Sequence, residues 1–501
     1  MTANLYDHLI ARAPQPDAVA METDGGDPSR YSDLARRSAQ MAQALVELGV
    51  TPGARVAAQI EKSVNGIVLY LATIRAGAVF LPLNTGYTAA EIGYFLNDAE
   101  PAVFVCDPAQ ADALAGVAAE AGARLVTLGA AGDGSLAEAA ERASTEFDTV
   151  PRGEDDLAAL LYTSGTTGRS KGAMLTHGNL LSNARTLCEA WRFSADDVLI
   201  HALPIFHTHG LFVAINVAFL SGASMIFLPK FDPLQVLSLM PRATVLMGVP
   251  TFYTRLLDQP GLTREACAGM RLFVSGSAPL LEETHHAWSE RTGHAILERY
   301  GMTETNMTIS NPYDGARIAG TVGLPLPGVD LRLTDPASGQ TVPPGEVGMI
   351  EVRGPNVFKG YWRMPEKTAE ELRADGFFIT GDLGQFDANG YLQIVGRSKD
   401  LVISGGLNVY PREVEAEIDA LPAVLESAVI GVRHRDFGEA VLAVVVRRGE
   451  ISVEAILEAL QGRLARFKQP KAVVFVDELP RNTMGKVQKN LLRERFAGVF
   501  G

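Results

Sequence analysis

Cysteine is scarce in this sequence, which has three in 501 residues. Cys106, Cys188 and Cys267 lie far apart, and their spacing matches neither a zinc site nor a redox pair. We therefore expect reduced thiols and a protein of the cytoplasm. The first residues also lack a basic stretch followed by an apolar one, so we expect no secretory signal peptide.

Positive charge is in deficit as well. The formal net charge is −14, which argues against nucleic acid or an anionic membrane as the main partner. Residues 210–229 lack charged side chains over nearly the length of a membrane span, but Asn216, Ser221, Gly222 and Ser224 interrupt this stretch. We expect a buried helix over 211–220, a turn and a strand over 224–228, and no membrane partner.

The chain is longer than a usual single domain, and 47% of its residues are hydrophobic. Its first part alternates between helical and strand patterns, which predicts an α/β fold with sheets covered by helices. The expected helices cover 31–50, 64–75, 108–121 and 250–257, and the expected strands cover 55–58, 78–82, 102–106, 124–127, 197–202, 244–248 and 271–275. From about residue 320, short strands between Pro and Gly turns indicate a small β-barrel or antiparallel layer.

A domain boundary is expected at residues 396–400, which separates a large N-terminal domain (1–398) from a small α+β domain (399–501). The expected elements of the small domain are strands at 401–404, 425–432, 440–447 and 471–476 and helices at 411–420 and 452–464. Residues 461–496 carry nine Lys or Arg and three acids. This basic segment is either a solvated face or a surface that docks a phosphorylated cofactor.

Residues 163–172, Thr-Ser-Gly-Thr-Thr-Gly-Arg-Ser-Lys-Gly, follow an apolar run at 157–162. Glycines let the backbone approach a ligand, hydroxyls and consecutive N–H groups donate hydrogen bonds, and Arg169 and Lys171 add positive charge. This combination favours a polyphosphate-binding loop over a flexible linker. It is not a Walker A loop, because Gly172 rather than Ser or Thr follows Lys171 and the glycine spacing is too short.

Three further turns carry polar groups suited to a nucleotide. Tyr300 to Glu304 supplies a ring for a purine, a hydroxyl for a phosphate and a carboxylate for Mg²⁺. Ser275 to Pro279 and Thr380 to Asp382 follow strands, and Asp382 is of the type that binds ribose hydroxyls. Each alone reads as an ordinary turn, but together with the phosphate loop they indicate one nucleotide site. The loop 480–486 presents Lys486, either to solvent or to a site in the other domain.

These motifs, with residues 396–400 and 404–406, occur in the order found in the adenylate-forming superfamily, which the chain resembles over nearly its whole length. That superfamily includes acyl-CoA synthetases, adenylation domains of peptide synthetases and firefly luciferase. More narrowly, residues 207–210 and 298–305 resemble those of malonyl-CoA synthetases (malonate–CoA ligases). The resemblance implies that a carboxylate attacks the α-phosphate of Mg·ATP, after which the small domain turns and coenzyme A displaces AMP.

The resemblance also implies roles for individual residues. The phosphates of ATP would be held by Thr163, Ser164, Gly165, Thr166, Thr167, Gly168 and Lys171. The adenine would lie against Gly276, Ser277, Ala278, Pro279 and Tyr300. The same wall of the ATP site would include Glu298, Arg299 and Gly301. Thr303 would contact the α-phosphate, Glu304 would bind Mg²⁺, and Asp382 with Arg397 would bind the ribose. Lys486 would be the adenylation lysine, Lys399 the hinge, and Gly405, Gly406, Phe437, Phe467 and Lys471 the coenzyme A contacts.

A malonate substrate needs a cation or several donors for its second carboxylate, because an unpaired buried charge is very costly. The candidates are His207, Thr208, His209, Arg299 and Met302, with His207 also expected in catalysis. In the opposing interpretation, His207 only gates the pocket and Arg299 supports the nucleotide. The alternatives for function are another short acid such as methylmalonate, an adenylating enzyme that loads a carrier protein, or an inactive homologue. A lysine acetyltransferase acting on Lys486 is a further expected partner.

Overall fold

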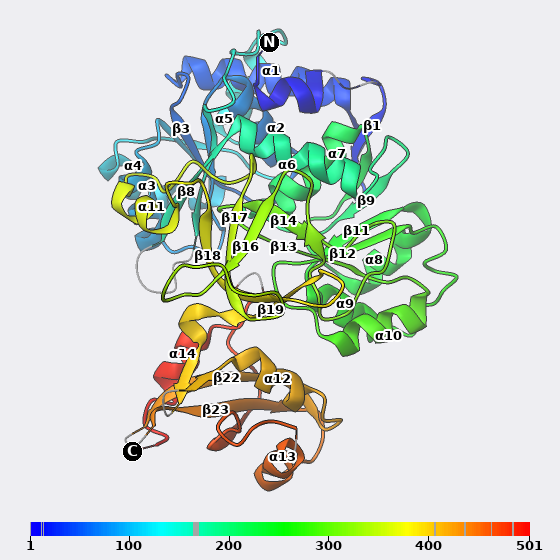
Figure 1. Ribbon diagram of the computed structural model, residues 1–501. Coiled ribbons are helices and arrows are strands. Elements are labelled where there is room, and N and C mark those ends of the chain that lie inside the picture. The colour runs from blue at the N-terminus through cyan, green and yellow to red at the C-terminus, as the bar shows by residue number, and fades with distance from the viewer. Residues whose placement is uncertain are drawn as a thin grey trace.

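The computed structural model describes residues 2–11, 13, 15–163, 170–404, 407–434, 437–461, 463–482 and 485–500. Figure 1 shows a large body that contains the N-terminus and a smaller C-terminal part below it, where β22, β23, α12 and α13 lie. The mixed α/β architecture predicted from the alternating patterns is confirmed. Among the described residues, no helix combines the length and apolar character needed to cross a membrane.

One sheet of the large body has six strands in the order β6-β5-β3-β4-β7-β8. Its strands are β3 (Arg55–Gln59), β4 (Val79–Pro82), β5 (Val103–Cys106), β6 (Arg124–Thr127), β7 (Leu157–Thr163) and β8 (Lys171–Thr176). The pairs are parallel except for β7 and β8, which pair antiparallel from Leu157 and Thr176 to Thr163 and Lys171. This hairpin brings the two ends of the predicted phosphate loop together.

The second sheet has nine strands in the order β15-β14-β13-β12-β11-β9-β10-β1-β2. Its strands are β1 (Val19–Glu22), β2 (Ser29–Arg30), β9 (Val198–His201), β10 (Ser224–Phe227), β11 (Val245–Gly248), β12 (Leu272–Ser275), β13 (Leu297–Met302), β14 (Asn306–Ser310) and β15 (Leu324–Pro325). The central strands of this sheet run parallel to one another; they are β13, β12, β11, β9, β10 and β1. Parallel strands gather their carboxyl ends at one edge, where ligands bind in such sheets.

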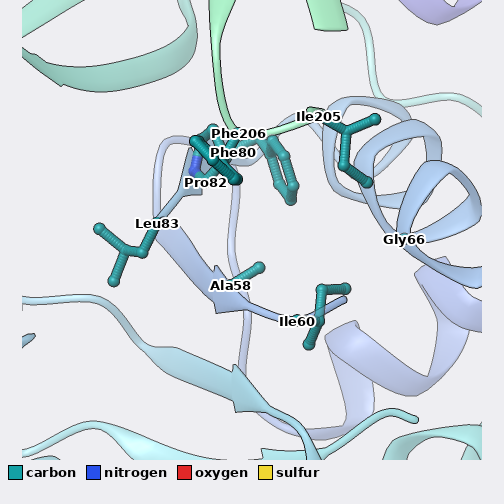
Figure 2. A pocket seen from close by; sticks show the side chains of 8 residues that line it. All are labelled: Ala58, Ile60, Gly66, Phe80, Pro82, Leu83, Ile205 and Phe206. Carbon is teal, nitrogen blue, oxygen red and sulfur yellow. The ribbon is translucent and has the colours of Figure 1, made fainter. Parts of the chain in front are cut away.

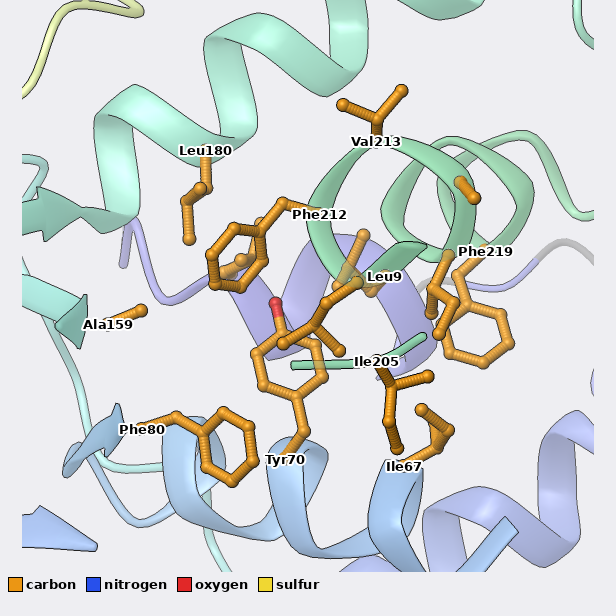
Figure 3. Packing of buried hydrophobic residues seen from close by; sticks show 14 of the residues in the cluster. Leu9, Ile67, Tyr70, Phe80, Ala159, Leu180, Ile205, Phe212, Val213 and Phe219 are labelled. Atoms are coloured by element: carbon orange, nitrogen blue, oxygen red, sulfur yellow. The ribbon is translucent and has the colours of Figure 1, made fainter. Parts of the chain in front are cut away.

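Helices between the two sheets form the main core. They include α1 (Tyr31–Glu47), α2 (Val64–Arg75), α6 (His177–Ala190), the π-helix η3 (His209–Ile215) and α7 (Asn216–Ser221). Figure 3 shows Tyr70 of α2 facing Phe212 of η3, with Leu180 of α6 beside them. The uncharged stretch from residue 210 is therefore buried inside the protein, as predicted, although its helix begins with π-helical turns.

The other α-helices of the described large body lie around the sheets or in the connections that follow. They are α3 (Ala89–Ala99), α4 (Ala111–Glu120), α5 (Ser135–Arg142), α8 (Pro233–Leu239), α9 (Pro250–Leu257), α10 (Glu282–Thr292) and α11 (Pro365–Glu371). The antiparallel layer expected after residue 320 contains β16 (Asp330–Thr334), β17 (Gly348–Arg353), β18 (Phe378–Phe386) and β19 (Leu392–Arg397), paired in that order. Its last pair sets Asp382 opposite Arg397.

The chain passes from β19 through the short helix η5 (Ser398–Asp400) into the C-terminal part. That part contains β20 (Val402–Ser404), β21 (Leu407–Val409), β22 (Val424–His434), β23 (Gly438–Arg447), β24 (Ala472–Val476), α12 (Pro411–Asp419), α13 (Val453–Leu460) and α14 (Lys489–Arg495). The helix predicted over 452–464 ends at Leu460. Buried valines of β22 and β23 pack against α12 and α13 and form a separate small core.

Candidate functional site

The hairpin β7–β8 holds Lys171 at the start of β8. The Lys171 ammonium lies 3.1 and 3.2 Å from the two carboxylate oxygens of Glu371, at the end of α11. It also lies 4.1 Å from the centre of the Tyr361 ring. Residues 164–169 of the predicted phosphate loop lie outside the described residues, so their roles stay predictions. Lys171 is nevertheless fixed at the base of that loop.

Tyr361 connects Lys171 and its partner to the predicted metal-binding residue. Its hydroxyl lies 2.6 Å from Glu371 Oε2 and 3.0 Å from Glu304 Oε1. Glu304 is 5% exposed, and burial raises its pKa. Among the described residues, no three His, Cys, Asp or Glu side chains gather as a metal site by themselves. A single carboxylate still fits Mg²⁺, which in nucleotide sites takes one or two carboxylates together with phosphate oxygens.

Asp382 and Tyr300 meet where the antiparallel layer reaches the nine-stranded sheet. The Tyr300 hydroxyl donates a hydrogen bond to Asp382 Oδ2 (2.6 Å), and Arg397 Nε lies 2.8 Å from Asp382 Oδ1. Burial, followed by the charge of Asp382, raises the pKa of Tyr300 well above its usual value. The predicted adenine and ribose residues are therefore adjacent.

The turn after β12 is shaped by a buried arginine. A Cβ at Gly276 would lie 2.4 Å from Arg299 Cζ, so only glycine leaves room for this guanidinium. Arg299 is 3% exposed, and its Nε and Nη2 have no hydrogen-bond partner among the described residues. Burial lowers the pKa of Arg299 to about 9. An arginine in this state has donors available for an anion.

Ser277 and His209 join this turn to the start of η3. Ser277 has a φ of 71°, which is uncommon for a residue other than glycine, and its Oγ lies 3.2 Å from His209 Nδ1. The other ring nitrogen of His209 and the Thr208 hydroxyl have no partner in the described part of the chain. Burial, followed by Lys486 and Arg299, lowers the pKa of His207 to about 3. His207 is therefore neutral at physiological pH.

The remaining residues of the predicted wall have more structural contacts. Glu298 Oε1 accepts a hydrogen bond from the Leu280 amide (3.2 Å), and burial raises the pKa of Glu298 to about 7. A Cβ at Gly301 would lie 1.9 Å from the Asn306 carbonyl oxygen, so the pairing of β13 with β14 requires glycine. Met302 and Thr303 are half-buried where β13 turns toward β14, and Ala278 is half-buried while Pro279 is exposed.

Lys486 enters this site from the C-terminal part on a tight loop. The Lys486 amide donates to Asn482 Oδ1 (2.9 Å), and the Asn482 amide donates to the Lys486 carbonyl oxygen (2.9 Å). Gly485, with a φ of 74°, packs against Thr251 of α9. Burial and Arg397 lower the pKa of Lys486, while the carboxylates of Asp382, Glu304 and Asp400 raise it. Lys486 thus faces the same place as the predicted ATP residues.

The predicted hinge and coenzyme A residues lie beyond this centre. Lys399 belongs to η5, and burial together with Arg397 lowers its pKa to about 8. The Lys471 ammonium lies 5.5 Å from the centre of the exposed Phe437 ring, so these two residues are adjacent. Phe467 packs on the small C-terminal core instead. Gly405 and Gly406 lie outside the described residues.

Sequence reasoning missed Tyr361 and Glu371. Neither belongs to a motif that the sequence alone singles out, because their meeting with Lys171 and Glu304 depends on α11 returning to β8. Tyr361 forms a β-bridge with Ala173 of β8, but this pairing is visible only in the folded structure and not in the sequence.

Comparison with known proteins connects this geometry to a family. Residues 10–362 match the family described as AMP-binding enzyme, and residues 413–486 match the AMP-binding enzyme C-terminal domain. A feruloyl-CoA synthase from an Amycolatopsis species is 40% identical over 488 residues, with 96% of each chain covered. The mitochondrial malonate–CoA ligase of Homo sapiens is 35% identical over 525 residues, which cover 96% of this chain and 90% of that one.

Solved structures agree in detail. The crystal structure of ATP-bound MatB from Rhodopseudomonas palustris is 62% identical, with 100% of each chain covered and a TM-score of 0.98. The apo structure of the same protein, at the same identity and coverage, gives a TM-score of 0.88. The whole chain therefore superposes more closely on the ATP-bound structure than on the apo structure.

Proposed function

The chain belongs to the AMP-binding enzyme family, and on that premise we propose that it ligates malonate to coenzyme A through a malonyl-adenylate, releasing AMP and pyrophosphate. One observation carries the choice of substrate. Arg299 is buried beside the nucleotide residues, and two of its nitrogens have no partner within the described chain. A second carboxylate on the substrate would satisfy them.

In the first step, Lys486 would bridge the attacking carboxylate and the α-phosphate. Two anions must meet there, and a cation that contacts both offsets their repulsion and the charge that develops at phosphorus. Asp382, held by Tyr300 and Arg397, would bind the ribose. Thr303 would donate to the α-phosphate. Lys171 and residues 163–168 would hold the β- and γ-phosphates, and Mg²⁺ on Glu304 would supply charge neutralisation there.

Ferulate is the competing substrate, because a feruloyl-CoA synthase is among the more similar relatives. An aromatic acid would leave the Arg299 guanidinium buried without an anion, which is costly. Malonate instead gives it a carboxylate, and malonate–CoA ligases of Arabidopsis thaliana and Homo sapiens are 36% and 35% identical to this chain. His207, Thr208 and His209 would add hydrogen bonds, and Met302 would limit bulk beside the substrate.

In the second step, the C-terminal part would turn about Lys399, in the short η5 helix between β19 and β20. Gly405 and Gly406 would then border the pantetheine arm. Phe437 and Lys471 would contact the nucleotide of coenzyme A, because they present an aromatic ring and a cation side by side. Phe467, also predicted as a coenzyme A contact, packs on the small core instead.

The proposal is tested by AMP release from ATP and coenzyme A with malonate, methylmalonate, acetate, succinate, octanoate and ferulate. We expect malonate to give the highest kcat/KM. Faster turnover of octanoate or ferulate would refute the dicarboxylate assignment, and turnover only with a carrier protein in place of coenzyme A would favour the carrier-loading alternative. In a second experiment, Lys486→Ala should lose adenylation by about 10²–10³-fold or more yet convert supplied malonyl-adenylate to the thioester.

We also propose that the enzyme acts in the cytoplasm and that acetylation of Lys486 silences it. The three cysteines are free thiols, which suits a reducing compartment. Acetylation removes the Lys486 charge, so adenylation should stop while the thioester step continues. Protein carrying acetyl-lysine at position 486 tests this in the two half-reactions, and equal adenylation rates with and without acetylation would dismiss it.

A further inference from the structure

Lys62 links the two large sheets at a point that no nucleotide motif includes. It follows β3 and directly precedes Ser63, the residue whose side chain caps α2 by accepting from the Gly66 amide (3.1 Å). The Lys62 ammonium lies 2.8 Å from His201 Nδ1 and 2.9 Å from the His201 carbonyl oxygen, at the end of β9. It also lies 4.4 Å from the centre of the Phe227 ring on β10.

His201 connects Lys62 to residues 207–210, the segment that contains residues assigned to the acid substrate. Its Nε2 lies 2.8 Å from the Gly210 carbonyl oxygen. A carbonyl oxygen can only accept, so Nε2 carries the proton and Nδ1 presents a lone pair to Lys62. Burial lowers the pKa of His201 well below its usual value, in keeping with a neutral ring. The Lys62 contact therefore selects the tautomer that holds Gly210.

The segment from Pro204 to Gly210 is tight enough to transmit this constraint. A Cβ at Gly210 would lie 2.0 Å from the Pro204 carbonyl oxygen, and the Leu211 amide donates to the His207 carbonyl oxygen (2.9 Å). Figure 2 shows Ile205 and Phe206 beside an apolar cavity of about 10 Å³, which is room for no more than one water. Ile205 also packs in the main core (Figure 3).

Lys62 has an unusual environment for a structural lysine. Within the described chain no carboxylate lies within ion-pair distance of it, and burial lowers its pKa well below the usual value. Lys62 is half-buried as a residue, and withdrawing its amine from water without a carboxylate partner is costly. Its hydrogen bonds lead through His201 to Gly210, the chain neighbour of His209, which contacts Ser277 and has one ring nitrogen without a partner among the described residues.

We propose that Lys62 is a positioning residue of the acyl pocket, which through His201 and the Gly210 carbonyl fixes the segment 207–209 for the second carboxylate of the substrate. This inference rests on the proposed function, because it assigns the segment to the acid rather than to ATP. In the part of the chain that the structure describes, the side-chain contacts of Lys62 are with His201 and Phe227 and not with a residue assigned to the nucleotide. Its loss therefore raises KM for malonate and leaves KM for ATP unchanged.

The test uses Lys62→Met, the conservative variant Lys62→Arg, and Lys230→Met, which removes an exposed lysine after β10 as the control. We expect Lys62→Met to raise KM for malonate about ten-fold, the equivalent of one well-formed hydrogen bond. Lys62→Arg should restore most of the affinity, and Lys230→Met should behave as wild type. Unchanged KM for malonate in folded Lys62→Met, or equal rises in KM for malonate and ATP, would overturn the proposal.

A double-mutant cycle with His201→Gln tests the route. If Lys62 acts through His201, Lys62→Met should add little in the His201→Gln background, whereas independent residues would give additive changes in log KM. Additivity would overturn the route. A wild-type preference for another acid would refute the proposed function instead, and the same cycle measured with that acid would still decide the role of Lys62.

Discussion

Lys171 and Glu371 form an ion pair between β8 and α11, with Nζ 3.1 Å from Oε1. Their side chains are 19% and 23% exposed, so water screens the pair only in part. Tyr361 stacks under the ammonium and places its hydroxyl between Glu371 and Glu304. Tyr361 therefore contacts both Lys171, which is expected to bind the phosphates, and Glu304, which is expected to bind Mg²⁺.

Glu371→Gln should weaken the hold on ATP. The substitution leaves Lys171 charged but removes its ionic partner, so the ammonium loses its fixed position at the base of the phosphate loop. We expect kcat/KM for ATP to fall about five-fold, in line with one partly exposed charged contact, while KM for malonate stays constant. Glu366→Gln, on the exposed first turn of the same helix, is the matched control. An equal loss in both variants would deny Glu371 a specific role.

Tyr300→Phe should raise KM for ATP. The variant keeps the ring but removes the hydroxyl that donates to Asp382 at 2.6 Å. Of the two partners of this carboxylate, Tyr300 and Arg397, only Arg397 then remains. The loss of one hydrogen bond to a charged group predicts a rise of about ten-fold. Steady-state kinetics at saturating malonate and coenzyme A measure it. If KM for malonate rises instead, Tyr300 belongs to the acyl pocket.

Most elements with strong patterns could be predicted from sequence. Helices 64–75 and 250–257 and the strand 124–127 have the predicted bounds, because their apolar spacing or flanking turns are clear. Helices at 89–99, 135–142 and 177–190 were not predicted. In α5, for example, the helix has only eight residues and buries only Leu136, Ala137 and Ala140, so its pattern is too short to stand out in the sequence.

Residues of the site could be predicted only where they belong to a short sequence motif. Residues 300–304, Asp382 and Lys486 were expected and lie near one another, although Tyr300–Met302 and Asp382 lie within β13 and β18 rather than in the predicted turns. Tyr361, Glu371, Lys62 and His201 could not be found, because each acquires its contact from an element more than a hundred residues away or from a return of the chain. The one-dimensional pattern around Lys62 is that of an ordinary lysine before a helix.

Glu298→Gln should change how stability depends on pH. The folded protein raises the pKa of Glu298 from 4.5 to about 7 through burial, so the folded state binds more protons than the unfolded state between these values. Wild-type stability from this group is therefore lost as pH rises through that window. Relative to wild type, the neutral variant should gain about 2–3 kcal/mol in unfolding free energy between pH 5 and 8.

Denaturant unfolding of both proteins at several pH values measures this difference, because contributions from other titrating groups cancel between them. The glutamine oxygen can still accept from the Leu280 amide, so the wall of the site should keep its shape. A constant difference between the two proteins from pH 5 to 8 would mean that Glu298 ionises normally in the fold.

Arg299→Met should separate the two interpretations of this arginine. If Arg299 binds the second carboxylate, kcat/KM for malonate should fall by about 10²–10³-fold, because a buried anion loses its charged partner. Acetate has no second carboxylate, so its slow turnover should change little, and KM for ATP should stay the same. If Arg299 supports the nucleotide through Gly276, KM for ATP should rise and both acids should lose activity equally.

Methionine suits this experiment because it fills much of the volume beside Gly276 without a charge. Arg255→Met, at an exposed position on α9, controls for the loss of one positive charge from the protein as a whole. The ratio of kcat/KM for malonate to that for acetate is the deciding quantity. A ratio unchanged from wild type would assign the second carboxylate to His207, Thr208 or His209 instead, since these are the other polar side chains that the sequence nominated for it.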